Sequence, residues 1–345
     1  MDLSERKLKI LQAIIQDFVQ SAEPVGSRTL SKKYDLGISP ATIRNEMADL
    51  EDMGYIKQPH TSAGRVPSDK AYRLYVDSIM DKYILTGQQK KLIREKILDD
   101  LIELDKTIQK ASNILSELTQ LTSFALTPKN DENKLKYIKL VPVDNENVLL
   151  MIVTETGKIN NTVLKIGSGY TEENLFMLSK VLTYNYKGRT LSSITKMEII
   201  KDFEEDIETM HKIMKNVMPN FLSTLESMLD VQLYMDGLTN IFSLPEYCNI
   251  QRAKDFMEML SQKDHLTEVL VNRDSGVVIT IGQENQDNEM KDCSLITATY
   301  TINGEVVGKL GVIGPTRMKY DEVTSIMEYM THNISKVYKI NDDKK

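Results

Sequence analysis

The sequence predicts an α+β protein of two or three domains that begins with a helical region. Roughly the first seventy residues contain three amphipathic helix patterns followed by a short strand and a turn. After Pro128 the pattern changes to strands, which a helical segment interrupts before more strands follow. A length of 345 residues, with 41% apolar and 27% charged residues, fits several folded domains.

The most informative helix is predicted to start at Ser39 and to end at Gly54. Ser39 is a favoured N-cap residue, Pro40 suits the first helical position, and Gly54 suits the left-handed residue after a helix. One apolar stripe, at i, i+4 and i+7, is formed by Ile43, Met47 and Leu50. This helix is therefore expected to pack one narrow face on a core and to expose the other.

The polar residues of this helix differ between its two ends. Thr42, Arg44 and Asn45 lie in its first turns, and its acidic residues Asp49, Glu51 and Asp52 lie in its last turns. A helix that enters the DNA major groove by its N-terminal end needs hydrogen-bond donors there and tolerates acids only farther away. Arginine and asparagine suit bidentate contacts with guanine and adenine. An ordinary amphipathic surface helix would show the same stripe, so the flanking segments decide between the two interpretations.

The flanking segments match a winged helix-turn-helix. A helix is predicted for Ser4–Val19, a second for Arg28–Tyr34, and a glycine-containing turn for Asp35–Ile38. After the helix that starts at Ser39, Tyr55–Gln58 is predicted as a strand and Pro59–Gly64 as a tight turn, the wing. Three helices and a wing are more specific than any one of them alone.

Two segments carry a resemblance to a known family. The segment ATIRNEMADLEDMGYIKQPHTSAGRVPSDKAYRLYVD (residues 41–77) and the segment IGPTRMKYDEV (Ile313–Val323) resemble the HrcA family of bacterial heat-shock repressors. The resemblance implies a homodimer that binds a CIRCE-type inverted-repeat operator in double-stranded DNA ahead of chaperone genes. It also implies dependence on the GroE chaperonin, and a fold of winged helix, GAF-like domain and inserted dimerising domain.

The predicted DNA contacts lie in the recognition helix, the helix before it and the wing. They are Arg28, Ser39, Ala41, Thr42, Arg44, Asn45, His60, Thr61, Ser62 and Arg65. Residues 1–80 hold eleven basic and eleven acidic side chains, and the rest of the chain supplies the net charge of −7. Phosphate contacts would therefore come from a local basic face, for which the candidates are Arg28, Lys32, Lys33, Arg44, Arg65 and Lys70. His60 could contact phosphate or a base, although a lone exposed histidine in a turn is more often a tolerated surface residue.

After the wing we expect a helix at Ala71–Tyr83 and a long helix at Gln88–Ser123. The long helix shows a heptad rhythm through Ile97, Leu101, Leu104, Ile108, Ala111, Leu115 and Leu118. Such a stripe pairs with its twin, braces the DNA-binding domain, or packs on its own domain. All three alternatives make it a stiff connector.

The remainder predicts an α+β domain with an insertion. Strands are expected at 135–143, 148–154, 161–166, 231–235, 277–281, 295–302 and 305–312, and helices at 172–186, 195–218, 250–260 and 321–339. Pro219 is expected to break or restart its helix, and Asn303-Gly304 to form a hairpin turn. The predicted domains are residues 1–83, 84–157 with 227–345, and an insertion at 158–226.

Composition disfavours membrane and enzyme functions. No apolar run approaches the roughly 20 residues that span a bilayer, and the first residues lack signal-peptide features. Two distant cysteines, Cys248 and Cys293, indicate a reducing cytoplasm. The four histidines are scattered, and GKLGVIG at 308–314 lacks the residues of a phosphate loop. We therefore predict no catalytic residues, no cofactor and no metal.

The mode of regulation stays open between two alternatives. Eighteen methionines and no tryptophan suit a marginally stable protein, because methionine fills cores adaptably but specifies them weakly. Such a repressor would lose DNA binding on heating and regain it with the chaperonin that the resemblance implies. The alternative is a winged-helix repressor of a metabolic operon that senses a small ligand, which would need inward polar residues in its strands.

Overall fold

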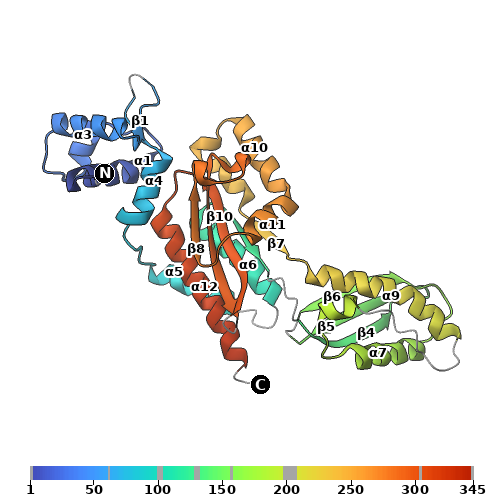
Figure 1. Cartoon of the computed structure of the whole chain (residues 1–345). Helices are drawn as coiled ribbons and strands as arrows, with labels where there is room; N and C mark the ends of the chain where they lie inside the picture. The colour runs from blue at the N-terminus through green and yellow to red at the C-terminus, as the bar shows by residue number, and fades with distance from the viewer. Residues whose placement is uncertain are drawn as a thin grey trace. The chain divides into compact units, whose positions relative to one another are not determined.

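The computed structural model describes residues 3–60, 63–98, 104–127, 133–155, 158–196, 208–302 and 305–342. The chain forms a mixed α+β fold that divides into two compact units (Figure 1). Unit 1 comprises Met1–Asp99, Gln109–Leu126 and Leu233–Lys345, and unit 2 comprises Asp100–Ile108 and Thr127–Gln232. Within unit 1 we call residues 3–79 the N-terminal module and the remainder the sheet domain.

The N-terminal module starts with three helices, as the sequence predicts. They are α1 (Glu5–Ser21), α2 (Ser27–Lys33) and α3 (Pro40–Asp52). The backbone amide of Lys7 donates to Ser4 Oγ at the start of α1, which satisfies one of the unpaired amides of a helix N-terminus. The fully buried Ile10, Ile14, Leu30, Ile43 and Leu50 come from all three helices and form one shared core.

A short antiparallel sheet follows α3. Strands β1 (Ile56–Lys57) and β2 (Val66–Pro67) pair with Ile56 opposite Pro67. Gly54 has the left-handed backbone, φ 77°, that the sequence predicts for it. The connection between these strands includes the predicted turn at Pro59–Gly64.

Two helical segments lead from this small sheet into the sheet domain. Helix α4 (Asp69–Leu74) is capped by Ser68 and continues as a π-helical turn, η1 (Tyr75–Ile79). The predicted helix at Ala71–Tyr83 therefore starts earlier and stops sooner. It stops because the Met80 amide bonds to Tyr75 O and the backbone then becomes extended.

The sheet domain is organised around five antiparallel strands in the order β7-β3-β10-β9-β8. These are β3 (Thr122–Leu126), β7 (Leu233–Asp236), β8 (Val277–Ile281), β9 (Cys293–Ile302) and β10 (Glu305–Pro315). The predicted hairpin turn at Asn303-Gly304 lies outside the described residues. The long pairing of β9 with β10 makes these two strands the centre of the sheet.

Helices cover both faces of this sheet (Figure 1). Ser294 and Ser123 lie on one face. Ser294 bonds there to Tyr320 of α12 (Tyr320–Asp342), and Ser123 donates to the carbonyl oxygen of Ser112 in α6 (Leu104–Thr119). Side chains alternate along a strand, so Lys309 of β10 points to the other face. There its ammonium donates to the last carbonyl groups of α11 (Lys263–Val271).

The predicted long helix at Gln88–Ser123 is wrong. The structure contains α5 (Gly87–Leu98) and α6 (Leu104–Thr119) instead, and residues 99–103 lie outside the description. Gln120 has a positive φ of 57°, which ends α6, and the buried run Thr122–Leu126 is strand β3. The heptad residues whose side chains are described, apart from the half-buried Leu118, are buried within this one chain: Ile97, Ile108, Ala111 and Leu115. Their stripe therefore packs on the chain's own core.

Unit 2 is a three-stranded sheet with helices on one face. The strands β4 (Leu135–Pro142), β5 (Asn147–Thr154) and β6 (Ile159–Lys165) are ordered β4-β5-β6. Their inner residues share one core with α7 (Glu172–Tyr186), α8 (Leu191–Thr195) and α9 (Glu208–Leu229). The longer segment of this unit, Thr127–Gln232, contains the β4–β5 hairpin, which the sequence analysis placed in the domain that ends at residue 157.

Pro219 does not end its helix, contrary to the prediction, but lies inside α9. A proline removes one helical hydrogen bond and crowds the preceding turn. Pro219 lies on the exposed face, where water can bond to the freed carbonyl group. Val217, Phe221 and Leu225 pack into the core on both sides of it and hold the helix in place.

The remaining elements complete the sheet domain. Helix α10 (Ile250–Ser261) was predicted, whereas α11 was not. Short 3-10 turns lie at Leu238–Ser243, Pro245–Tyr247, Gly282–Glu284 and Asn288–Met290. Within the described ranges, no helix combines enough length with enough apolar character to cross a bilayer.

Candidate nucleic-acid interface

The start of α3 presents the strongest candidates for contacts with DNA bases. The Thr42 amide donates to Ser39 Oγ at 3.1 Å, so the helix is capped as the sequence predicts. Because Ile43 and Met47 face the core, Arg44 and Asn45 point to solvent. Neither side chain forms a hydrogen bond or ion pair with another described residue. Their donors are therefore available to a ligand.

The neighbouring candidates surround this helix end. Ser39 and Ala41 are exposed beside Arg44, and Thr42 is half-buried. Arg28 is exposed on α2, which packs against α3. The structure thus places the predicted residues of α2 and α3 on one continuous part of the N-terminal module.

Two of the acidic residues of α3, Glu46 and Asp49, form ion pairs with bases of α1. Lys7 Nζ lies 2.8 Å from Glu46 Oε2 and 2.9 Å from Asp49 Oδ2, and Arg6 also contacts Glu46. The hydrogen bonds to Glu46 and Asp49 raise the pKa of Lys7, so its charge is secure. These ion pairs keep two carboxylates of the helix turned toward α1 and leave Arg44 unpaired.

Arg65 at the base of the wing is held by two sets of contacts. Its backbone amide and carbonyl groups bond to those of Val25, each at 2.8 Å. Its Nε and Nη2 atoms lie 2.8 and 2.7 Å from Glu51 Oε2, which leaves Nη1 without a partner among the described residues. Gly64 permits this approach, because an added Cβ would lie 2.5 Å from the Val25 carbonyl group. Arg65 is therefore a support of the wing, with part of its guanidinium still available.

Of the other predicted wing contacts, the structure describes one. His60 is exposed, and its imidazole forms no hydrogen bond or ion pair with another described residue. Thr61 and Ser62 lie outside the described residues. Lys57 is a further candidate, absent from the predicted contacts, because it is exposed on β1 while Ile56 is buried. The alternation of apolar and basic residues at 56 and 57 was the signal that could have identified it.

Besides Arg65, two of the predicted basic residues have partners within the module. Lys33 Nζ lies 2.5 Å from Asp17 Oδ1, and this hydrogen bond raises the pKa of Lys33. Lys70 Nζ donates to Met53 O at 2.9 Å and lies 4.3 Å from the centre of the Tyr55 ring. Of the predicted basic face, Arg28, Lys32 and Arg44 are the residues that the described contacts leave fully to solvent.

Elsewhere, one cavity of about 430 Å³ lies on the α11 side of the sheet domain. Arg273 lines it, but Thr297, Thr280 and two backbone carbonyl groups already accept from its guanidinium. Burial lowers the pKa of Arg273 to about 10. Among the described residues, no group of three histidine, cysteine or acidic side chains is arranged to hold a metal ion.

These features describe an α+β protein whose small N-terminal module exposes an arginine and an asparagine at the capped start of a helix, an arrangement that suits contacts with nucleic acid. Comparisons with known proteins identify the family. A family model described as "HrcA protein C terminal domain" matches residues 105–324. The chain is 45% identical over 340 residues to the heat-inducible transcription repressor HrcA of Alkaliphilus metalliredigens strain QYMF, covering 98% of this chain and 99% of that protein.

A second relative agrees, and a solved structure shows the same fold. The heat-inducible transcription repressor HrcA of Clostridium tetani strain Massachusetts / E88 is 43% identical over 341 residues, covering 98% of this chain and 97% of the relative. A crystal structure titled a hypothetical protein superposes with a TM-score of 0.71 at 24% identity, over 98% of this chain and 99% of that one. The chain belongs to the HrcA family of heat-inducible transcription repressors, a family of regulators rather than of enzymes.

Proposed function

We propose that the N-terminal module is a winged helix that binds double-stranded DNA through α3. The observation that carries this proposal is the capped start of α3, where Arg44 and Asn45 are exposed and unpaired. Arg44 suits a bidentate contact with guanine, and Asn45 suits one with adenine. Ser39, Ala41 and Thr42 lie close enough along the helix to contact bases or the adjoining backbone.

The remaining predicted residues would position the module on the duplex. Arg28 lies on the helix before α3, where helix-turn-helix proteins contact phosphate groups. In the wing, His60, Thr61, Ser62 and the free Nη1 of Arg65 would contact the backbone or the minor groove. Such contacts raise affinity for all sequences and make binding dependent on salt.

The larger assembly we propose is a cytoplasmic homodimer on a CIRCE-type inverted repeat ahead of chaperone genes. The sheet domain would be the GAF-like domain, and unit 2 the inserted dimerising domain. Unit 2 supports this role with apolar side chains on the uncovered face of its sheet, where Tyr137, Ile159 and Val163 are 39%, 47% and 58% exposed. Two-fold assemblies bind two-fold symmetric operators.

A gel-shift comparison of two arginine variants tests the proposal. Arg44→Ala is expected to cost roughly 1–3 kcal/mol on the operator and to reduce discrimination against mismatched operators. Arg252→Ala is the matched control, because Arg252 is an exposed arginine on α10 of the sheet domain. Unchanged operator discrimination by Arg44→Ala would refute the placement of α3 in the major groove.

For regulation we propose that the GroE chaperonin maintains the active fold. The buried methionines suit a marginally stable core: Met47, Met218, Met228, Met259, Met290, Met318, Met327 and Met330. The heated protein should regain operator binding with chaperonin and fail to regain it fully alone. Complete spontaneous recovery, indifferent to chaperonin, would contradict this mechanism.

The cavity beside Arg273 favours one alternative, a repressor of a metabolic operon that senses a small ligand. Polar side chains from the strands do face it, among them Thr280. Against this, the guanidinium of Arg273 is already satisfied by protein groups. A metabolite that releases the protein from its operator without heating would raise this alternative above the heat-linked one, as would a metabolic operon beside the gene.

A further inference from the structure

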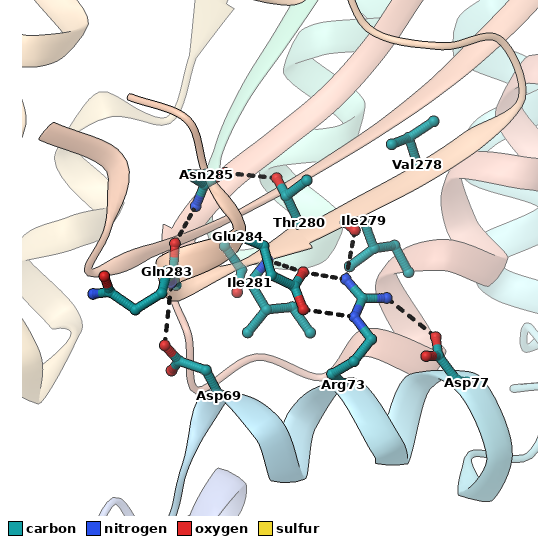
Figure 2. Close-up of polar contacts among 12 residues, drawn as sticks. Asp69, Arg73, Asp77, Val278, Ile279, Thr280, Ile281, Gln283, Glu284 and Asn285 are labelled. Carbon is teal, nitrogen blue, oxygen red and sulfur yellow. Dashed lines mark hydrogen bonds and ion pairs between the residues drawn. The ribbon is translucent and has the colours of Figure 1, made fainter. Parts of the chain in front are cut away.

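Arg73 of α4 connects the N-terminal module to the sheet domain (Figure 2). Its Nε donates to Glu284 Oε1 at 2.8 Å, and its Nη2 contacts Glu284 Oε2 and donates to Ile279 O of β8 at 2.7 Å. Its Nη1 lies 3.1 Å from Asp77 on the same helical face. A guanidinium with two parallel bonds to one carboxylate fixes orientation as well as distance.

A second contact from α4 lies beside this pair. The backbone amide of Gln283 donates to Asp69 Oδ2 at 3.2 Å. Figure 2 shows that Asp69 and Arg73 extend from one helix toward the same segment. The approach depends on Gly282, where an added Cβ would lie 2.0 Å from Asp69 Oδ2 and where φ is 54°. The segment after β8 is therefore shaped to receive α4.

A second arginine, Arg317 of the sheet domain, connects to α1 through a backbone carbonyl group, and its ion pair with Glu246 lies within the sheet domain. Arg317, in the Ile313–Val323 segment, places Nε 2.5 Å and Nη2 3.0 Å from the two carboxylate oxygens of Glu246. Its Nη1 donates to Val19 O at 2.7 Å. That carbonyl group lies in the last turn of α1, where carbonyl groups lack helical partners and attract a cation. The Arg317 side chain is only 11% exposed.

A pair of buried tyrosines forms a further contact between α4 and the sheet domain. Tyr72 of α4 lies 5.8 Å from Tyr320 of α12, measured between ring centres, and both side chains are buried. Between the module and α5 the chain runs through residues 80–86, which form neither helix nor strand. The side-chain contacts described above therefore restrict how far the module can turn about this segment.

We infer that Arg73, Glu284, Arg317 and Glu246, here called the two-arginine clasp, set the half-site spacing that the repressor recognises. In a two-fold dimer, the distance and rotation between the two α3 helices follow from how each module is fixed to its body. The clasp residues would then be positioning residues that act through α3 without touching DNA. This inference rests on the proposed function, because it needs a dimer that binds an inverted repeat.

Spacer-length selectivity tests the inference directly. The full-length chain and the double variant Arg73→Gln with Arg317→Gln would be titrated with operators whose spacer is altered by one or two base pairs. One added base pair moves a half-site by about 3.4 Å and about a tenth of a turn. The unaltered protein should lose roughly tenfold in affinity per base pair, as for a mismatched base.

The double variant should show a flatter profile, with less than about threefold loss per base pair. Its affinity for DNA that carries one half-site should stay unchanged, because α3 is intact. Arg252→Gln on α10 is the matched control and should keep the unaltered profile. Exchanging the first pair, by Arg73→Glu with Glu284→Arg, should recover part of the selectivity that Arg73→Gln alone loses.

Three outcomes would overturn the inference. The double variant could keep the unaltered spacing profile, lose half-site binding in parallel, or bind every operator more tightly because the clasp restrains the module. Thermal melting, expected to remain a single folded transition, shows whether any loss comes from unfolding. If the unaltered protein ignored inverted repeats altogether, the proposed function would fail first.

Discussion

Replacing Arg65 and Glu51 one at a time separates two roles for the arginine at the base of the wing. We expect Arg65→Ala to weaken binding to operator and non-operator DNA alike. We expect Glu51→Ala to leave affinity unchanged or to increase it, because it removes a carboxylate that competes with phosphate for the same guanidinium. The two changes should therefore move DNA affinity in different directions.

The structure bounds the size of these effects. Arg65 and Glu51 side chains are 22% and 32% exposed, so solvent screens the pair and its contribution is about 1 kcal/mol at most. Removing Glu51 can therefore raise affinity by no more than roughly fivefold. Removing Arg65 should lower the slope of log affinity against log salt by about one, because one phosphate contact is lost through Nη1.

Titration of labelled operator and non-operator DNA at several salt concentrations measures both quantities. Arg6→Ala is a matched control, because Arg6 also pairs with a glutamate of α3, Glu46, but lies on α1. Suppose that Glu51→Ala weakened binding as much as Arg65→Ala and that neither changed the salt slope. Arg65 would then only support the wing, and its assignment as a DNA contact would be refuted.

Two further predictions concern Gly64 and Glu284. Gly64→Ala should destabilise the N-terminal module by roughly 1–3 kcal/mol in denaturant unfolding, because its Cβ would collide with the Val25 backbone; Gly87→Ala, with no atom near the added Cβ, should be nearly neutral. Although burial acts to raise it, the hydrogen bonds from Arg73 and the Ile281 amide hold the pKa of Glu284 below its ordinary value of 4.5. Its stabilising effect should therefore be complete above that value and be lost as pH falls through the lowered pKa. The melting difference between the unaltered protein and Glu284→Gln should vanish in acid, and a difference that persisted there would contradict this assignment.

The sequence predicted correctly those helix ends that are determined by capping residues and glycines. Ser39 and Pro40 predicted the start of α3, and Gly54 its end, because a cap and a left-handed glycine act within one turn. The helix at Glu172–Tyr186 has the predicted bounds, since Thr171 caps it by a reciprocal capping box with Asn174. Caps and capping boxes depend on residues that are close together in the sequence, so they can be recognised from the sequence alone.

Elements that depend on packing were not predictable in the same way. The heptad pattern that runs toward Leu118 does not reveal that Gln120 turns the chain and that Thr122–Leu126 pairs between β7 and β10. Strand β3 forms because it pairs with β7 and β10, which lie more than a hundred residues away in the sequence. The local pattern alone therefore predicted that the helix would continue through these residues. Pro219 was misjudged for a related reason, because the core contacts on both sides of it outweigh its local cost.

The candidate site shows the same division. Exposure of Arg44 and Asn45 follows from the helical period, but the ion pair of Arg65 with Glu51 joins two elements and has no periodic signal. The two-arginine clasp is more remote still, since Arg73 and Glu284 are 211 positions apart. Arg317 lies in the segment Ile313–Val323 that carries the resemblance, but the sequence did not single it out, and only the structure shows that its side chain contacts α1.

Charge pairing explains how an N-terminal region with no net charge can serve as a DNA-binding module. Eleven basic and eleven acidic residues cancel over residues 1–80, so composition predicts no attraction to phosphate. The structure pairs three of the four acids of α3 with bases of α1 and of the wing: Glu46 with Arg6 and Lys7, Asp49 with Lys7, and Glu51 with Arg65. The fourth, Asp52, is exposed at the C-terminal end of the helix, away from Arg44. What remains unpaired at the helix start is Arg44, with Arg28 on the adjacent helix. At physiological salt the Debye length is about 8 Å, so charges farther from the DNA than this are largely screened. The electrostatic potential at the DNA is therefore determined by these nearby unpaired cations, and the net charge of the whole N-terminal module has little influence.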